Sequence, residues 1–358
     1  MRILHVAERL SDRGGAYTWL LGIVEALRAR HDVALAVGQD DGTAHPCRVF
    51  VRTGLASRTA ARFELDDLAA TADVIHLHNV MNPALLEWAT ARPNTLLTVQ
   101  DHRLLCPGRG KWTLEGEVCR RPLARELCGS CFEDAAYFGE IHALTERRLA
   151  AARRMPLTVL SRYMREELVA AGVPPARVHV VPPFVLDLDP GAPPSGPPCV
   201  LFVGRLVEAK GVWEAVDAWR RSGLDLPLVL VGTGPLRDRL EASLRGHERV
   251  EITGWLDRRA LSGVYARAHA LLLPSRWQEP FGIVGLEALT FGVPVAAWES
   301  GGVGEWHPGP GLARWGDVPG LGRALREVAG RRLWLRPRFD RDEAVGRLLA
   351  LYGRLAGA

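Results

Sequence analysis

Short apolar runs alternate along the chain with longer segments in which apolar residues recur every three or four positions. In the first half the runs cover 2–7, 32–38, 48–52, 73–77, 95–100, 158–161 and 178–181. Such runs are typical of buried strands, and the periodic segments between them, such as 17–30 and 139–155, are typical of amphipathic helices. The alternation predicts a parallel sheet with helices on its faces.

The same alternation returns in the second half. Apolar runs cover 200–203, 228–231, 250–254 and 270–273, and an amphipathic helix is expected near the end, over 340–356. Between the halves lies a stretch rich in proline and glycine, which is typical of a linker. The pattern predicts a first domain over 1–183, a linker over 184–198, a second domain over 199–339, and a C-terminal segment over 340–358.

Composition narrows the class of protein. The 358 residues suffice for two domains, and 47% of them are hydrophobic, so each domain can bury a core. The net charge is only +4 and forms no basic stripe, so we expect no nucleic-acid partner. No apolar run has membrane-spanning length, and Met1 leads directly into a strand, so we expect a cytoplasmic protein. Four arginines on the helix 139–155 are interpreted first as a solvated helix face, and peripheral contact with the inner membrane face is the alternative.

Two glutamates with seven residues between them follow the run 270–273. Glu279 lies in a loop closed by Pro280 and Gly282, and Glu287 lies about one turn inside a helix expected over 283–291. The free N–H groups at 282–284 would face an anion. An ordinary strand-turn-helix with two solvated glutamates would give the same pattern.

Two cations follow the first strand of the second domain. Arg205 and Lys210 stand in a loop between the run 200–203 and the next helix. Only two of the 45 basic residues are lysines, Lys111 and Lys210, so a lysine retained at a strand end is a candidate point charge. Such cations can neutralise a departing diphosphate without a metal ion. We therefore expect no catalytic metal.

The first domain has candidates at its strand ends too. Gly14 and Gly15 separate a strand from a helix, and such a pair lets backbone amides approach a phosphate, although a plain tight turn is the alternative. His78 and Asn79 end the run 73–77, where open α/β sheets bind ligands, so they are candidates for an acceptor site. His102 follows the run 95–100 and is a candidate for positioning an acceptor hydroxyl or for capping the loop.

Four of the six cysteines fall within 26 positions, in a loop expected over 102–133. They are Cys106, Cys119, Cys128 and Cys131. One C-x2-C pair among four thiols suits a structural zinc, while an iron–sulfur cluster or no metal are the alternatives. Arg103, Arg109 and Lys111 make the same loop basic, and we expect them on the acceptor side.

Together these motifs resemble retaining glycosyltransferases of family 4, including a subset with a cysteine-rich loop in the N-terminal domain. The resemblance covers nearly the whole chain. It rests on Gly14-Gly15, 76–79, 161–163, Arg205 with Lys210, Trp255-Leu256 and 279–287. It implies a GT-B fold, in which two Rossmann-like doubly wound domains face each other across a cleft and the last helix crosses back to the first domain.

The resemblance also implies roles for individual residues. The donor would be a nucleoside-diphosphate sugar on the second domain, with the Gly14-Gly15 loop over its diphosphate. Arg205 and Lys210 would hold the leaving diphosphate, Glu279 the sugar and Glu287 the ribose. The further donor contacts would come from Trp255, Leu256, Phe281, Gly282, Ile283 and Val284. The leaving phosphate would act as the base in a front-face reaction, with Glu279, Arg205, Lys210 and His102 as the catalytic group.

The predicted activity is retaining transfer of a sugar to a hydroxyl of a glycan, a lipid-linked acceptor or a small molecule such as a natural product. A nucleotide-sugar epimerase on the same fold and a catalytically idle partner subunit are the alternatives. Loss of the glutamates or of Arg205 and Lys210 would favour an idle subunit, and all four residues are present.

Overall fold

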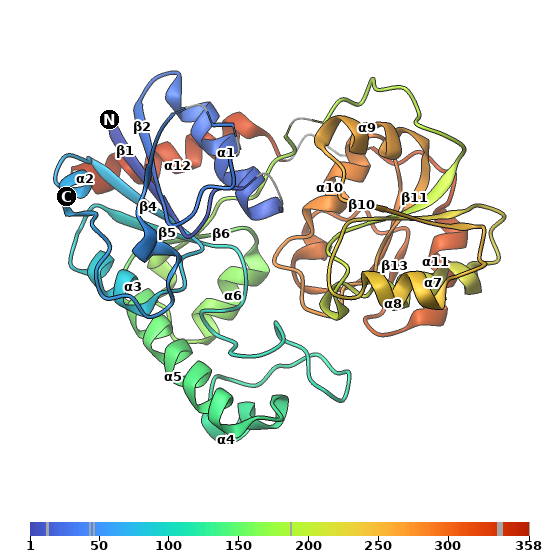
Figure 1. Ribbon diagram of the computed structural model, residues 1–358, viewed down its shortest axis with the longest axis horizontal. Helices are drawn as coiled ribbons and strands as arrows, with labels where there is room; N and C mark the ends of the chain where they lie inside the picture. The colour runs from blue at the N-terminus through green and yellow to red at the C-terminus, as the bar shows by residue number, and fades with distance from the viewer. Residues whose placement is uncertain (12–13, 43, 46, 187, 335–338, 358) are drawn as a thin grey trace. The chain divides into compact units, whose positions relative to one another are not determined.

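The computed structural model describes residues 1–11, 14–42, 44–45, 47–186, 188–334 and 339–357, and it comprises two compact units (Figure 1). Unit 1 contains Met1–Lys111, Arg120–Leu186 and Phe339–Ala358. Unit 2 contains Trp112–Cys119 and Asp187–Arg338. The division at 186/187 falls inside the predicted linker, and the C-terminal segment belongs to unit 1.

Unit 1 is built on a seven-stranded parallel sheet in the order β3-β2-β1-β4-β5-β6-β7. The strands are β1 (Arg2–Ala7), β2 (Asp32–Val37), β3 (Arg48–Val51), β4 (Val74–His78), β5 (Thr95–Val99), β6 (Leu157–Val159) and β7 (Val178–Val180). Every residue of β4 and β5 is buried, which is expected where helices cover both faces of a parallel sheet. The strand order reverses between β1 and β4, and ligands of open α/β sheets bind at such a switch point.

The helices of unit 1 lie between these strands. They are α1 (Gly15–Arg28), α2 (Asp66–Ala69), α3 (Pro83–Thr90), α4 (Arg125–Cys128), α5 (Ala135–Ala152), α6 (Arg162–Ala170) and α12 (Arg341–Ala356), with 3₁₀ turns η1 (Thr53–Ala56), η2 (Gly129–Cys131) and η3 (Pro175–Arg177). The predicted start of α5 at Gly139 was too late. Its N-cap is Asp134, whose side chain accepts hydrogen bonds from the N–H groups of Ala136 and Tyr137.

The C-terminal helix α12 packs beside α1 and against β4, as the red and blue ribbons of Figure 1 show. A buried chain of hydrogen bonds holds α12 in place. The Tyr352 hydroxyl lies 2.6 Å from Nδ1 of His76, whose Nε2 lies 2.6 Å from Oγ1 of Thr98. A buried histidine needs partners for both nitrogens, and here it has them. His76 is therefore a structural residue that joins the end of the chain to the sheet.

Unit 2 has a six-stranded sheet in the order β10-β9-β8-β11-β12-β13, and all its pairs are parallel. The strands are β8 (Cys199–Val203), β9 (Leu228–Val231), β10 (Val250–Gly254), β11 (Ala268–Leu273), β12 (Val295–Trp298) and β13 (Leu312–Ala313). The helices are α7 (Val212–Ser222), α8 (Arg237–Ser243), α9 (Arg258–Arg267), α10 (Ile283–Thr290) and α11 (Val318–Val328), with 3₁₀ turns η4 (Glu208–Lys210) and η5 (Gly301–Glu305). Its switch point lies between β8 and β11.

The cysteine-rich loop 102–133 contains structure of its own. It includes α4 and η2, and a short antiparallel bridge joins Trp112 to Val118. Its segment Trp112–Cys119 belongs to unit 2, where the Arg276 guanidinium lies 4.4 Å from the Trp112 ring centroid. Within the described ranges, none of the helices combines the length and the apolar character needed to cross a bilayer.

Candidate active site

Lys210 is placed by the tight connection between β8 and α7. It ends η4, and the next residue, Gly211, has φ +70°. A Cβ at Gly211 would lie 1.8 Å from the carbonyl oxygen of Pro274, so only glycine allows this approach. The close contact brings Lys210 to the loop after β11, which carries Glu279. Arg205 follows β8 after Gly204 and is exposed, and its side chain forms no hydrogen bond or ion pair with the described residues.

Glu279 is held on several sides in that loop. Its Oε1 lies 2.8 Å from Nζ of Lys210 and also accepts a short hydrogen bond from the Ser275 hydroxyl. Its backbone N–H donates to Oγ of Ser300 at 3.1 Å. Nζ of Lys210 also lies 4.3 Å from the centroid of the Trp277 ring. The structure therefore brings together two of the predicted catalytic residues in one preorganised ion pair.

The charge of Glu279 is stabilised although only 3% of the residue is exposed. Burial alone would raise the pKa of this carboxyl. The Lys210 ammonium and the hydrogen bonds from Lys210, Ser275 and Trp277 outweigh it and lower the pKa below its ordinary value. Glu279 is therefore a carboxylate at neutral pH.

Glu287 lies on α10 and is 5% exposed. Its Oε1 lies 2.7 Å from an Nη of Arg258, and its Oε2 accepts a hydrogen bond from the Tyr265 hydroxyl at 2.9 Å. Burial and the neighbouring Glu287 raise the pKa of Tyr265 well above its usual range, so this phenol keeps its proton. Arg258 and Tyr265 were not predicted, because their spacing on α9 is that of any amphipathic helix.

The remaining predicted donor residues surround these carboxylates in sequence. Gly282 has φ +86° and precedes the first turn of α10, to which Ile283 and Val284 belong. Phe281 is buried, and its carbonyl accepts a hydrogen bond from Nε1 of Trp306 at 2.6 Å. Trp255 follows β10 and is 40% exposed, and Leu256 beside it is half-buried.

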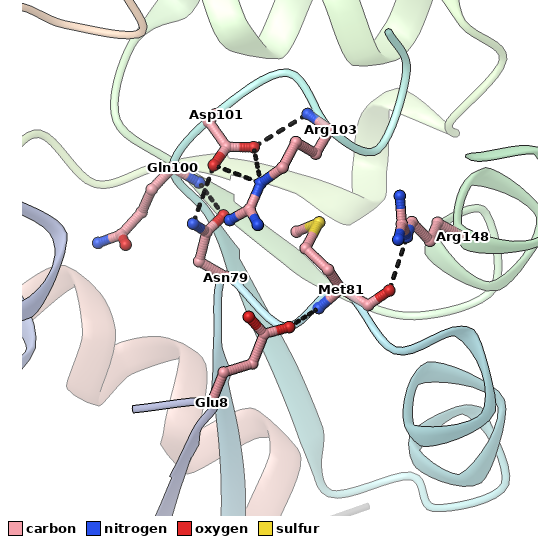
Figure 2. A network of polar contacts seen from close by, with 7 residues as sticks. All are labelled: Glu8, Asn79, Met81, Gln100, Asp101, Arg103 and Arg148. Carbon is pink, nitrogen blue, oxygen red and sulfur yellow. Dashed lines mark hydrogen bonds and ion pairs between the residues drawn. The ribbon is translucent and has the colours of Figure 1, made fainter. Parts of the chain in front are cut away.

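Unit 1 carries a second polar group at its own switch point, shown in Figure 2. Asp101 accepts hydrogen bonds from the N–H and Nε of Arg103 at 2.9 Å each, and from Nδ2 of Asn79 at 3.0 Å. Glu8 directly follows β1, and its Oε1 accepts a hydrogen bond from the Met81 N–H at 2.7 Å. The Met81 carbonyl in turn accepts from Nε of the buried Arg148 at 2.6 Å.

A small cavity of about 80 Å³ opens beside this network. It is lined by Ala7, Glu8, Ala16, Tyr17, Leu20, His78, Asn79, Gln100 and Arg103. Three of the predicted acceptor-side residues, His78, Asn79 and Arg103, are therefore neighbours here. Glu8 and Gln100 were missed, although both directly follow a strand and the rule that selected His78 applies to them.

The other predicted acceptor-side residues do not line this cavity. Nζ of the buried Lys111 lies 3.0 Å from a carboxylate oxygen of Glu167 on α6. His102 is buried, with Nε2 3.1 Å from the Tyr163 hydroxyl, and Arg109 is half-buried in the cysteine-rich loop. Their roles toward an acceptor stay predictions. Gly14, with φ +121°, is the N-cap of α1, so the Gly14-Gly15 pair does lead into a helix N-terminus.

The four loop cysteines form no disulfide in the part of the chain that the structure describes. Cys106, Cys128 and Cys131 belong to unit 1 and Cys119 to unit 2. Among the residues that the structure describes, the one group of three or more potential ligands is His5, His76 and His78. Both nitrogens of His76 are already hydrogen-bonded, so we interpret this group as a polar core. The structural zinc stays a prediction.

Comparison with known proteins finds a family match within unit 2. Residues 187–306 match the family model "Glycosyl transferases group 1". The 2-deoxystreptamine glucosyltransferase of Streptomyces kanamyceticus is 34% identical over 215 residues, 53% of this chain and 55% of that protein. The D-inositol 3-phosphate glycosyltransferase of Xylanimonas cellulosilytica is 31% identical over 238 residues, 55% of this chain and 56% of that protein. The chain thus spans about half the length of these curated relatives.

The solved structures extend the likeness to the whole fold. Anabaena Alr3699/HepE, solved in complex with UDP-glucose, superimposes with a TM-score of 0.68 at 17% identity and covers 99% of this chain and 100% of its own. Its two parallel α/β units agree with the doubly wound sheets described above, which confirms the predicted fold class. The chain has a GT-B fold, and its residues 187–306 match the glycosyltransferase group 1 family.

Proposed function

We propose that this protein is a retaining glycosyltransferase that moves a sugar from a nucleoside diphosphate to an acceptor hydroxyl. One observation carries the proposal. The ion pair of the half-buried Lys210 with the buried Glu279 lies at the switch point of the unit that matches the group 1 family, and a second buried carboxylate, Glu287, follows on α10. A buried carboxylate whose pKa is shifted by a specific charged partner is typical of functional sites.

The leaving diphosphate is assigned to Lys210 and Arg205. An ammonium has three N–H donors, and the described contacts of Lys210 use one of them on Glu279. The others are free to reach a phosphate oxygen. Arg205 is exposed and adds a bidentate donor. These two cations supply the charge that a divalent metal supplies elsewhere, so the reaction requires no catalytic metal.

The two glutamates are assigned to the donor's hydroxyl groups. Glu287 keeps acceptor lone pairs beside those used by Arg258 and Tyr265, and it would bind the ribose. Glu279 would bind the sugar and stabilise positive charge at its anomeric carbon. The amides at the start of α10 would face phosphate or sugar oxygens, and Trp255 with Leu256 would contact the base.

The chemical step follows from this arrangement. The bond between the anomeric carbon and the diphosphate oxygen breaks, and the acceptor oxygen bonds to the same face of that carbon. The acceptor's proton passes to the leaving phosphate, so the diphosphate serves as the base. The negative charge on the leaving group then lies beside Lys210 and Arg205, which stabilise the transition state.

The relatives support a nucleotide-sugar donor and a small polar acceptor. One is named for glucosyl transfer to 2-deoxystreptamine, and the HepE structure holds UDP-glucose. UDP-glucose is therefore the first donor to test. We assign the donor to unit 2 and the acceptor to unit 1, where a glycan, a lipid-linked sugar or a small natural product would present its hydroxyl.

A panel of nucleotides and nucleotide sugars in a thermal-shift assay tests the donor assignment. We expect stabilisation by one nucleoside diphosphate and by its sugar conjugate, in the presence of EDTA. NMR of the product of an α-linked donor should then show an α-linkage. An inverted product or an absolute need for Mg²⁺ would contradict the mechanism. Interconversion of sugars without transfer would identify an epimerase, and binding without turnover an idle subunit.

A further inference from the structure

The cavity of unit 1 offers one carboxylate that no neighbour neutralises by direct contact. Oε1 of Glu8 accepts a hydrogen bond from the Met81 N–H, which fixes the carboxylate's orientation. Among the described residues, Oε2 has no hydrogen-bond or ion-pair partner. The neighbouring Asp101 differs, because Arg103 and Asn79 occupy both its oxygens. Glu8 therefore presents a fixed hydrogen-bond acceptor to the cavity.

The surroundings of Glu8 are unfavourable to its charge. Burial raises the pKa of Glu8, and the nearby Asp101 adds to this. The hydrogen bond from the Met81 N–H opposes the rise, as do Arg103 and Arg58 from a distance. A carboxylate kept partly buried without a contacting cation is a feature of ligand sites, because a ligand's donor group can complete its hydrogen bonding. The cavity also contains the amide of Gln100, and the Nδ1 atom of His78 there is buried without a partner.

The size and charge of the cavity restrict the ligand. A volume of about 80 Å³ corresponds to a few water molecules, so it admits part of one six-membered ring and no whole disaccharide. Arg103, the basic residue among the lining residues, is paired with Asp101, so Glu8 and Asp101 together carry one more negative charge than Arg103 neutralises. A phosphate group would add further negative charge beside Glu8, and like charges repel.

We propose that this cavity binds a hydroxyl-bearing ring of the acceptor, an unphosphorylated cyclitol or monosaccharide, and that Glu8 accepts a hydrogen bond from it. The proposal rests on the proposed function and names the substrate class of its acceptor side. Amino-substituted rings belong to the same class, because an ammonium group is also a donor to a carboxylate.

Binding to the full-length chain tests the proposal, by calorimetry and saturation-transfer NMR with UDP present. The probes are myo-inositol, 2-deoxystreptamine and an inositol monophosphate. We expect at least one of the first two to bind and the phosphate to bind at least tenfold more weakly. Glu8→Gln should weaken binding of the ring at least tenfold, because a charged acceptor is lost. The matched control Glu166→Gln, at an exposed position on α6, should change nothing.

The outcomes separate this proposal from the proposed function. Unchanged ring binding in Glu8→Gln, no binding of either unphosphorylated ring, or tightest binding of the phosphate would each overturn the assignment of the cavity. Failure of every nucleoside diphosphate of the thermal-shift panel to bind, with ring binding still dependent on Glu8, would instead contradict the glycosyltransferase reaction and leave the cavity as a polyol site. The presence or absence of nucleotide binding therefore serves as the independent readout.

Discussion

The switch points of the two sheets place carboxylates at the same topological position and surround them differently. In unit 2, Glu279, after β11, has Lys210 at 2.8 Å, and Glu287, on α10, has Arg258 at 2.7 Å. In unit 1, Asp101, after β5, is paired with Arg103, whereas Glu8, after β1, has the Met81 N–H as its one hydrogen-bond partner among the described residues. One unit completes its charges internally, and the other leaves one carboxylate to be completed by a ligand.

This difference suits the two substrates that we assign to the units. A nucleoside diphosphate is anionic, so a site for it needs excess cations, and the carboxylates there must be balanced before the ligand arrives. A sugar or cyclitol ring brings mainly hydroxyl donors, for which an unbalanced carboxylate is a suitable acceptor. The contrast can be tested by removing the cation on one side and the unpaired charge on the other.

The largest effect is expected from removing the cation of unit 2. Lys210→Ala should lower kcat at least ~100-fold, comparable to the loss of one preorganised charge-stabilising donor. Arg245→Ala, at an exposed position in the same unit, is the control and should leave kcat unchanged. Both are measured with the donor that the thermal-shift panel identifies. Near-normal turnover of Lys210→Ala would remove the diphosphate role from this residue and with it the contrast between the units.

A smaller effect is expected from loosening Glu287. Tyr265→Phe removes the hydroxyl that donates to Oε2 of Glu287 at 2.9 Å, and the loss of a hydrogen bond to a charged group weakens nucleotide binding about tenfold. Calorimetry with UDP and 2′-deoxy-UDP measures it. The wild type should prefer UDP, and the variant should lose most of that preference.

Tyr137→Phe is the matched control, because Tyr137 is 51% exposed on α5. A uniform loss of affinity for both nucleotides in Tyr265→Phe would indicate a purely structural tyrosine. Unchanged discrimination in that variant would separate Glu287 from ribose recognition altogether.

The fold and part of the site followed from the sequence for identifiable reasons. Parallel strands buried on both faces give continuous apolar runs, so β1, β4, β5, β8 and β11 were predicted to within a few residues. Glu279 and Glu287 stand at a spacing tied to one strand-turn-helix, and their placement after β11 needed no long-range information. Lys210 was distinguished by its rarity in an arginine-rich chain.

The parts that escaped prediction depend on contacts between distant segments. Glu8 and Met81 meet across 73 positions, and Arg258 and Glu287 across 29. No local pattern marks such partners. The ion pair of Lys111 with Glu167 on α6 is another such contact, which the position of a lysine in a basic loop did not predict. Local spacing predicts the strand, helix or loop on which a residue lies, whereas the tertiary structure determines which residues it contacts.

The smallest effects should have opposite signs in the two units. Glu279→Gln weakens the pair with Lys210 and should lower the free energy of unfolding at pH 7 by about 1 kcal/mol. Glu8→Gln removes a partly buried charge and keeps an acceptor for Met81, so it should raise the free energy of unfolding by a similar amount.

The pH dependence of these effects follows from the pKa shifts. The pKa of Glu279 is lowered from 4.5, because Lys210 and its hydrogen bonds outweigh burial, so its stabilising contribution is present above pH 4.5 and is lost as the pH falls through the lower, folded-state value. The pKa of Glu8 is raised from 4.5 by burial. The destabilisation by its ionised carboxylate is therefore absent below pH 4.5 and grows as the pH rises through the higher, folded-state value.

Urea unfolding of the wild type and both variants between pH 4 and pH 7 measures the two curves. Their differences from the wild type should diverge toward neutral pH, and equal signs at pH 7 would mean that the two switch points do not treat their carboxylates differently.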